Sequence, residues 1–360
     1  MYDVTIIGAG PAGATLAKII GRQYRVLLVD RRESDDEREN RINSNCCGGL
    51  LAPDAQAMLS RLGLGLPKKV LVDPQIFVVR TIDLEQNLEQ YYQRFYINMD
   101  RRKFDAWLWS MLPDSVDTRS GFQFRSYDRK ESCFEIRLSR DGKSYTEKTK
   151  IIVGADGGHS TVRKQAFAAH QTPDPYFAIQ EWVVADSPLP YFSAIFDREI
   201  TNYYSWVIPK DGHLVIGSAL EPRKNAAEKF NLLKDKMRRY GLDTGRTVTR
   251  EGAFIERPSK VKQVLVGRDG IVLIGEAAGW ISPSSAEGIS YAFRSAILLA
   301  ESLSEGLEGF EERYRRKARS LRINIRLKNA KSPFIFHPLL RKIVMRSGIK
   351  SVDVDSEKPG

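Results

Sequence analysis

A glycine-rich turn near the N-terminus carries the residues whose types and spacing most clearly predict chemistry. Its sequence GAGPAG, at positions 8–13, fits the pattern G-x-G-x-x-G. In such a turn Gly8 allows a tight reversal, Gly10 lets the backbone approach a pyrophosphate, and Gly13 lets a helix pack closely on a strand. Asp30 follows Gly10 by twenty residues and is placed to accept hydrogen bonds from a ribose. The turn therefore predicts a dinucleotide-binding site.

The segments around this turn predict the strand–helix–strand unit that such a site requires. Residues 4–7 form an apolar run of strand length, and residues 26–29 form a second one that ends at Asp30. Between them, apolar residues recur at helical spacing from Ala14 to Ile20. The N-terminus of that helix would present free N–H groups and the positive end of its dipole to phosphates.

Length and composition are those of a soluble globular protein with a large core. The chain has 360 residues, of which 42% are hydrophobic and 28% are charged. It has no run of about eighteen apolar residues, so we predict no transmembrane helix. A strand at the start leaves no room for a signal peptide, and three cysteines give no disulfide framework. We therefore expect a cytoplasmic protein.

The net charge of +11 is concentrated near the C-terminus. Between Arg313 and Arg346 the sequence has twelve Lys or Arg and no Asp or Glu. Apolar residues among them fall at helical spacing: Phe310, Tyr314, Ala318, Leu321 and Ile325. A basic amphipathic helix is typical of attachment to an anionic membrane. We therefore expect the tail to attach the protein to the inner face of the membrane. The alternative is a helix packed on its own domain with a solvated basic face. We expect no nucleic-acid partner, because no nucleic-acid motif is present.

The remaining segments predict an α/β fold with a discontinuous first domain. Residues 75–83 and 90–98 have strand composition, and residues 176–220 are rich in aromatic and β-branched residues, as in an antiparallel sheet. Asp54 is predicted to cap a helix. In the tail, Pro333 and Pro338 are predicted to break an apolar stretch. We assign residues 1–72, 99–168 and 256–310 to a Rossmann-like cofactor domain, 73–98 and 169–255 to an inserted antiparallel-sheet substrate domain, and 311–360 to a basic helical tail.

Two later motifs complete a recognisable order. GADGGHSTVR at 154–163 and GEAAG at 275–279 follow the N-terminal glycine turn. In this order the motifs resemble those of the two-dinucleotide-binding-domain flavoproteins of the p-hydroxybenzoate hydroxylase class. The resemblance implies FAD as cofactor, with Asp156 and Gly157 near the pyrophosphate. It also implies that Gly275, Glu276 and Ala277 lie near the ribitol, with Glu276 where most relatives carry Asp.

Four further motifs narrow this resemblance. They are CGG at 47–49, RxxFD at 101–105, YxWxxPK at 204–210 and AAGWISPSSAEGISYAF at 277–293. Together they resemble the geranylgeranyl reductase family, and NCCGGLLAPDAQ with GEAAG and the basic tail is most similar to its bacterial CbrA branch. That family reduces isolated C=C bonds of isoprenoid chains with reduced FAD. The resemblance implies a lipophilic, polyprenyl-like substrate.

The resemblance and the glycine pattern together give the expected site residues. Catalytic roles are expected for Cys47, Tyr204 and Trp206. No metal site is expected, because the four histidines are scattered. The cofactor-binding set is Gly8, Gly10, Ala12, Gly13, Asp30, Arg31, Cys47, Gly48, Gly49, Arg101, Asp156, Gly157, Gly275, Glu276, Ala277, Gly288 and Ile289.

Several alternatives stay open at the level of sequence. Cys46 and Cys47 could form a strained vicinal disulfide, act in redox chemistry or fill space. Tyr204 and Trp206 share a strand face, which could line a substrate cavity or belong to a sheet core. The whole chain could be a flavin-dependent monooxygenase or halogenase, or a flavin-containing lipid-binding protein without turnover. No second nucleotide-binding unit is evident, so the electron source is expected to be transiently bound NAD(P)H or a reduced protein carrier.

Overall fold

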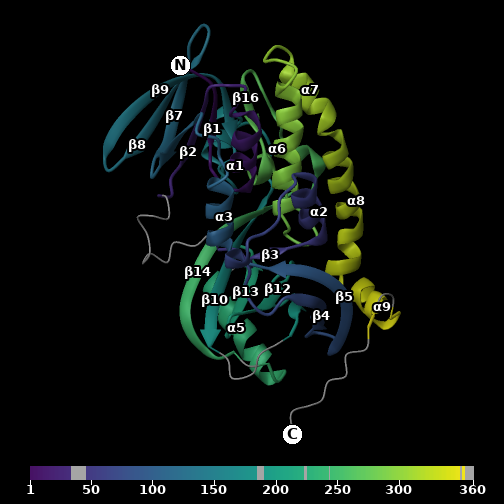
Figure 1. Ribbon diagram of the computed structural model, residues 1–360. Helices are drawn as coiled ribbons and strands as arrows, with labels where there is room; N and C mark the ends of the chain where they lie inside the picture. The colour runs from purple at the N-terminus through teal and green to yellow at the C-terminus, as the bar shows by residue number, and fades with distance from the viewer. Residues whose placement is uncertain (34–45, 185–189, 223–224, 243, 349–350, 353–360) are drawn as a thin grey trace.

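A computed structural model describes residues 1–33, 46–184, 190–222, 225–242, 244–348 and 351–352. Two eight-stranded sheets form its frame, with helices packed around the first and a row of helices along one side of the molecule (Figure 1). The α/β prediction is confirmed, and the sheets are mixed.

The first sheet is built around parallel strands. Its central order is β15-β16-β9-β1-β2-β6, and β7 and β8 extend it through β9. The inner strands are buried on both faces, as their continuous apolar runs require. The strands are β1 (Tyr2–Ile7), β2 (Val26–Asp30), β6 (Val116–Ser120), β7 (Gln123–Arg129), β8 (Phe134–Arg140), β9 (Lys143–Gly154), β15 (Gly267–Arg268) and β16 (Ile271–Leu273).

The second sheet has the order β14-β10-β13-β12-β11-β4-β5-β3. The second sheet is antiparallel, as predicted, at every pair of this order except one, because β11 runs parallel to β4. The strands are β3 (Leu50–Leu51), β4 (Ile76–Asp83), β5 (Leu88–Asn98), β10 (Asp174–Val184), β11 (Phe192–Phe196), β12 (Ser205–Lys210), β13 (His213–Leu220) and β14 (Arg246–Arg257). The proposed domain boundaries stay a prediction.

The helices connect these sheets, and several of them pack on the first one. α1 and α6 pack on each other beside the parallel strands, and α8 runs from this layer toward the second sheet (Figure 1). They are α1 (Pro11–Ile20), α2 (Pro53–Arg61), α3 (Arg101–Trp109), α4 (Thr161–Ala166), α5 (Ala226–Arg239), α6 (Ile289–Leu303), α7 (Phe310–Lys317), α8 (Arg319–Phe336) and α9 (Pro338–Arg346), with 3-10 turns η2 (Lys68–Val70), η3 (Val261–Gln263) and η4 (Gly275–Ala278).

Two helix predictions need correction. Asp54 does not cap α2: the capping residue is Ala52, and Pro53 takes the first helical position, where its missing N–H costs nothing. Pro333 does not break the tail, because α8 continues through it for one turn and ends before Pro338. A proline this close to a helix end removes only one backbone hydrogen bond.

The tail is partly integrated into the main core. Its apolar residues at helical spacing, from Phe310 through Tyr314 to Ile325, are buried in the core of the first sheet. The tyrosine hydroxyl of Tyr314 donates to the carbonyl of Leu273 at 3.1 Å. These residues are therefore not free to contact a membrane. Residues 349–350 and 353–360 of the predicted tail lie outside the described residues.

Candidate functional site

The three cofactor motifs meet at one edge of the first sheet. β1 pairs with β9 so that Ile7 lies opposite Gly154, and β16 pairs with β9 so that Leu273 also lies opposite Gly154. All three strands are parallel, so the GAGPAG, ADGG and GEAAG segments leave the sheet side by side. Ligands of parallel α/β sheets bind beyond these carboxyl ends.

The glycines of the first turn have distinct surroundings. A Cβ on Gly13 would lie 1.8 Å from the carbonyl oxygen of Gly8, and one on Gly8 would lie 2.4 Å from that of Ala155. By contrast, a Cβ on Gly10 or Gly157 would meet no heavy atom within 4 Å. Gly8 and Gly13 therefore serve close packing, while Gly10 and Gly157 border open space. This is the cradle that a pyrophosphate-containing cofactor requires.

Asp30 is placed at the end of β2, but its carboxylate already has partners. It accepts from the backbone N–H of Ala9 at 2.7 Å and from the guanidinium of Arg32 at 2.9 and 3.0 Å. Burial would raise the pKa of Asp30, but the hydrogen bonds from Arg32 and Ala9 bring it below its ordinary value. Arg31, which the resemblance selects, is exposed instead. Arg32 is thus the neighbour that fixes Asp30.

A chain of charged contacts leads from Asp30 to Cys47. Arg32 Nη1 lies 2.8 Å from one oxygen of Asp105, and Arg101 Nε lies 2.9 Å from the other. Arg101 Nη1 then donates to the sulfur of Cys47 at 3.4 Å. Burial lowers the pKa of Arg101, but Asp105 and Cys47 together raise it above its ordinary value. The side chains of the RxxFD motif therefore join the ribose-side acid to the cysteine loop.

The Cys47 loop packs on one face of β12. A Cβ on Gly48 would lie 2.6 Å from Ile208 Cδ1, and one on Gly49 would lie 2.6 Å from Lys210 Nζ. Ile208 and Lys210 follow Trp206 at every second position, so all three share a strand face. Lys210 is a site residue that sequence reasoning missed, although it lies in the YxWxxPK motif.

Lys210 is a buried ammonium whose hydrogen-bond acceptors among the described residues are neutral oxygens. Its Nζ donates to Asn98 Oδ1 at 2.7 Å, to the carbonyl of Met99 at 2.8 Å and to that of Gly49 at 3.3 Å. Burial lowers its pKa to about 8, against smaller opposing effects of Cys47, Asp100 and Asp211. The residue therefore ties the end of β12 to the loop that carries Cys47.

The two adjacent cysteines have different environments. Cys46 packs against the aromatic core of the second sheet, and burial raises the pKa of its thiol to about 12. Cys47 instead contacts Arg101 and the backbone N–H of Gly49. Both thiols are free, so the structure does not form the vicinal disulfide. Cys46 is the better candidate for packing and Cys47 for chemistry.

Tyr204 and Trp206 lie in this aromatic core, with ring centroids 5.8 Å apart. The Tyr204 hydroxyl donates to the carbonyl of Ser285 at 2.7 Å, and burial raises the pKa of Tyr204 well above its ordinary value. Trp206 Nε1 is buried without a hydrogen-bond partner among the described residues. The Trp206 indole packs over Gly217, where a Cβ would lie 2.4 Å from Nε1.

The loop before α6 is held by the second sheet. One oxygen of Glu287 accepts from Tyr96 at 2.7 Å and from Arg94 at 3.0 Å, while Tyr204 holds Ser285. Gly288 follows as the residue before α6, and Ile289 is its first residue. The second sheet therefore positions the N-terminus of α6, whose N–H groups and dipole favour negative charge.

The acidic residues of the second and third motifs, Asp156 and Glu276, have different roles. Asp156 accepts from Ser160 Oγ at 2.5 Å and from the N–H of Thr161 at 2.7 Å, so its carboxylate holds its own loop and the start of α4. Glu276 accepts from the N–H of Glu256 at 3.3 Å, and burial, aided by the charge of Glu256, raises its pKa to about 7. Arg163, missed in the sequence, links both motifs by donating to the carbonyl of Ala277 at 3.3 Å.

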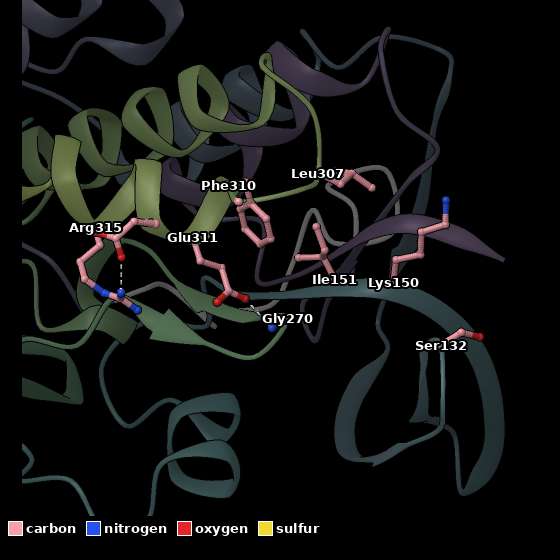
Figure 2. Close-up of a pocket in the computed structure, with 10 residues that line it drawn as sticks. Ser132, Lys150, Ile151, Gly270, Leu307, Phe310, Glu311 and Arg315 are labelled. Carbon is pink, nitrogen blue, oxygen red and sulfur yellow. Dashed lines mark hydrogen bonds and ion pairs between the residues drawn. The ribbon is translucent and has the colours of Figure 1, made fainter.

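A cavity of about 470 Å³ lies away from these residues (Figure 2). Its wall includes Lys150, Ile151 and Phe310, together with Glu311, whose carboxylate accepts from the backbone N–H of Gly270 at 2.5 Å. No residue of the three cofactor motifs lines it. We therefore place the functional site at the sheet edge and not in this cavity.

Sequence comparison establishes the family of the chain. Residues 114–316 match a protein family described as FAD binding domain. The sheet edge and its glycine cradle thus belong to an FAD-binding protein. Over 351 residues, 98% of this chain, the sequence is 40% identical to Protein CbrA of Escherichia coli strain K12, with 98% of that protein covered. Protein CbrA of Shigella sonnei matches to the same extent. The chain belongs to the CbrA family of FAD-binding proteins.

Solved structures with the same fold span several activities. A geranylgeranyl bacteriochlorophyll reductase-like protein from Thermoplasma acidophilum matches with a TM-score of 0.78 at 18% identity, over 95% of this chain and 90% of that one. PqsL of Pseudomonas aeruginosa, a probable FAD-dependent monooxygenase, matches with a TM-score of 0.68 at 18% identity, over 97% and 99%. A flavin-dependent brominase matches with a TM-score of 0.70, also at 18% identity, over 96% of this chain and 94% of that one. At these identities the likeness establishes the shared fold.

Proposed function

We propose that this protein is an FAD-dependent reductase that adds two hydrogens across a C=C bond of a lipophilic, polyprenyl-like substrate. One observation carries the proposal: the Cys47 loop lies between the cofactor edge and the aromatic face of the second sheet. Arg101 holds this loop from the cofactor side, and Lys210 holds it from the sheet side. The arrangement would present an apolar chain to the cofactor beside one thiol.

The residues expected to hold FAD follow from the cradle. Gly10 and Gly157 leave open space for a pyrophosphate, and the N-terminus of α1 would stabilise its charge. Arg32 fixes the position of Asp30, the acid expected to lie near the ribose. Glu276, with its pKa near 7, would carry a proton part of the time and so tolerate neighbouring negative charge. Reduced FAD, when bound, supplies hydride equivalents.

The chain itself must supply a proton and exclude water. An isolated alkene has no carbonyl to polarise, so its reduction requires a positioned acid in a dry pocket. Cys47 is the candidate acid, because Arg101 orients its sulfur and would stabilise the thiolate left after proton transfer. Tyr204 stays protonated and holds Ser285, while Trp206 and its aromatic neighbours exclude water.

A second candidate is a flavin-dependent monooxygenase or halogenase. The shared fold with a brominase and a probable monooxygenase favours it. A third is a flavin-containing protein that binds lipid without turnover. The electron source we propose is transiently bound NAD(P)H or a reduced protein carrier.

Product analysis separates these functions. Purified holoprotein, polyprenyl lipid and a reductant are incubated with and without O₂, and products are identified by mass spectrometry. We expect lipid with two added hydrogens in the anaerobic sample. Oxygenated or halogenated product that forms only with O₂ would favour the second candidate, and tight lipid binding without product would favour the third.

A further inference from the structure

Apolar side chains are exposed on both α8 and α9, and together they define the docking face. Leu339 and Ile343 on α9 are 63% and 65% exposed, and Phe334 at the end of α8 is 53% exposed. Ile323 and Leu327 are exposed to a similar degree. On α8, Ile323, Leu327 and Phe334 are four and then seven residues apart, so they form one stripe of the helix.

Basic side chains border this stripe. On the helical wheel, Arg319 and Arg326 lie on one side of the stripe and Lys331 on the other. All three are exposed, and none forms an ion pair with an acid in the described ranges. No Asp or Glu occurs from Arg313 to Arg346. An apolar stripe between basic rows is the pattern of a helix that lies in an anionic membrane interface.

The elbow between α8 and α9, at residues 334–341, has its other side in the aromatic core. Phe336, two residues from Phe334, packs on Tyr203 and Phe196 with ring centroids 5.1 and 6.1 Å apart. The guanidinium of Arg257 lies 4.5 Å from the ring centroid of Phe336. One helical turn therefore joins the outer surface to the cluster that contains Tyr204 and Trp206.

A buried ion pair fixes the elbow in place. Arg341 Nε lies 2.7 Å from Asp83 Oδ2, and both side chains are almost fully buried. Arg341 also donates to the carbonyls of Ile335 and Phe336 at 3.2 Å. The exposed face is thus carried by a helix pair that is anchored to β4, as the approach of α9 to the second sheet in Figure 1 illustrates.

We propose that the exposed apolar side chains of α8 and α9 dock on an anionic bilayer and so bring its lipid chains close to the aromatic core. The substrate part of the inference rests on the proposed function. The sequence alone predicts membrane attachment through the whole basic segment, residues 311–347. The structure moves it toward the elbow, because Arg315 pairs with Glu312 and Arg322 is half-buried.

Vesicle flotation tests the docking face with full-length holoprotein. Vesicles contain phosphatidylcholine alone or with phosphatidylglycerol. We expect binding only with the anionic lipid, and release at high salt. The double variant Leu339→Glu/Ile343→Glu should lower the bound fraction at least fivefold, and Arg326→Gln/Lys331→Gln at least threefold. Both should retain FAD and the wild-type melting temperature.

Val248→Glu is the matched control, because Val248 is 54% exposed on β14, at the opposite edge of the second sheet. It should float like wild type. Wild-type binding in the Leu339→Glu/Ile343→Glu variant, or equal binding to uncharged vesicles, would overturn the inference. Light scattering could also overturn it, by showing that the wild type is a dimer and this variant a monomer. A second copy of the chain would then cover the exposed apolar side chains. Protein that floats with anionic vesicles but does not reduce their lipid would support the docking inference and contradict the proposed reductase activity.

Discussion

The ammonium of Lys210 lies 3.3 Å from the carbonyl oxygen of Gly49, two residues after Cys47. Lys210 is 3% exposed and has no carboxylate among its hydrogen-bond partners in the described residues. A charged amine in such a place loses hydration that three neutral oxygens only partly replace. Lys210 is therefore not a strong source of stability, and its role is to hold the loop that carries Cys47 in position.

The pH dependence of stability should reveal this buried amine. The pKa of Lys210 is lowered from 10.5 to about 8 in the folded protein. Between these values the unfolded chain binds a proton that the folded chain has released. The free energy of unfolding should therefore rise with pH there, by at most about 1.4 kcal/mol per pH unit, relative to Lys210→Met. Urea unfolding from pH 7 to 10.5 measures the difference.

Gly10 should control FAD content without controlling the fold. A side chain there would enter open space, so Gly10→Val should fold and lose most of its FAD. Gly13→Val should fail to fold, because its Cβ would collide with the carbonyl of Gly8. FAD released per chain on denaturation, together with the far-ultraviolet circular dichroism, separates the two effects. Full FAD occupancy in Gly10→Val would reject the pyrophosphate assignment.

The two cysteines should respond differently to removal. Cys47→Ala should slow lipid reduction at least tenfold with little change in FAD content, because it removes the thiol that Arg101 orients. Cys46→Ala should mainly lower the melting temperature, because Cys46 packs in the aromatic core. Single-turnover rates and thermal unfolding give both quantities. Equal, mild rate effects of both variants would favour a packing role for each.

The Arg341–Asp83 pair should be strongly stabilising against loss of one partner. Asp83→Ala leaves a buried guanidinium without its carboxylate, which typically costs about 3–5 kcal/mol. The double variant Asp83→Ala/Arg341→Met should recover part of that loss. Denaturant unfolding measures both, and a cost below about 1 kcal/mol for Asp83→Ala would show that the pair does not anchor α9.

Sequence reasoning predicted the structural elements that depend on local sequence pattern. The turn at Gly8 to Gly13 is defined by its own glycines, and strand-forming composition was enough to predict β4 and β5. Contacts between distant segments were not predictable. Lys210 and Gly49 are 161 residues apart, and Arg341 and Asp83 are 258 apart, so neither pairing leaves a local signal. Arg32 was within reach, because an arginine two residues after Asp30 can fold back on it.

A single anaerobic turnover tests the central claim most directly. The protein is reduced with dithionite, freed of excess reductant and mixed with polyprenyl lipid. The flavin absorbance is followed during the reaction, and the mass of the lipid is then measured by mass spectrometry. We predict that oxidised flavin returns in step with a gain of two hydrogens per lipid, and that Cys47→Ala slows both equally. Flavin that stays reduced, with lipid of unchanged mass, would contradict the assignment of this protein as a lipid C=C reductase.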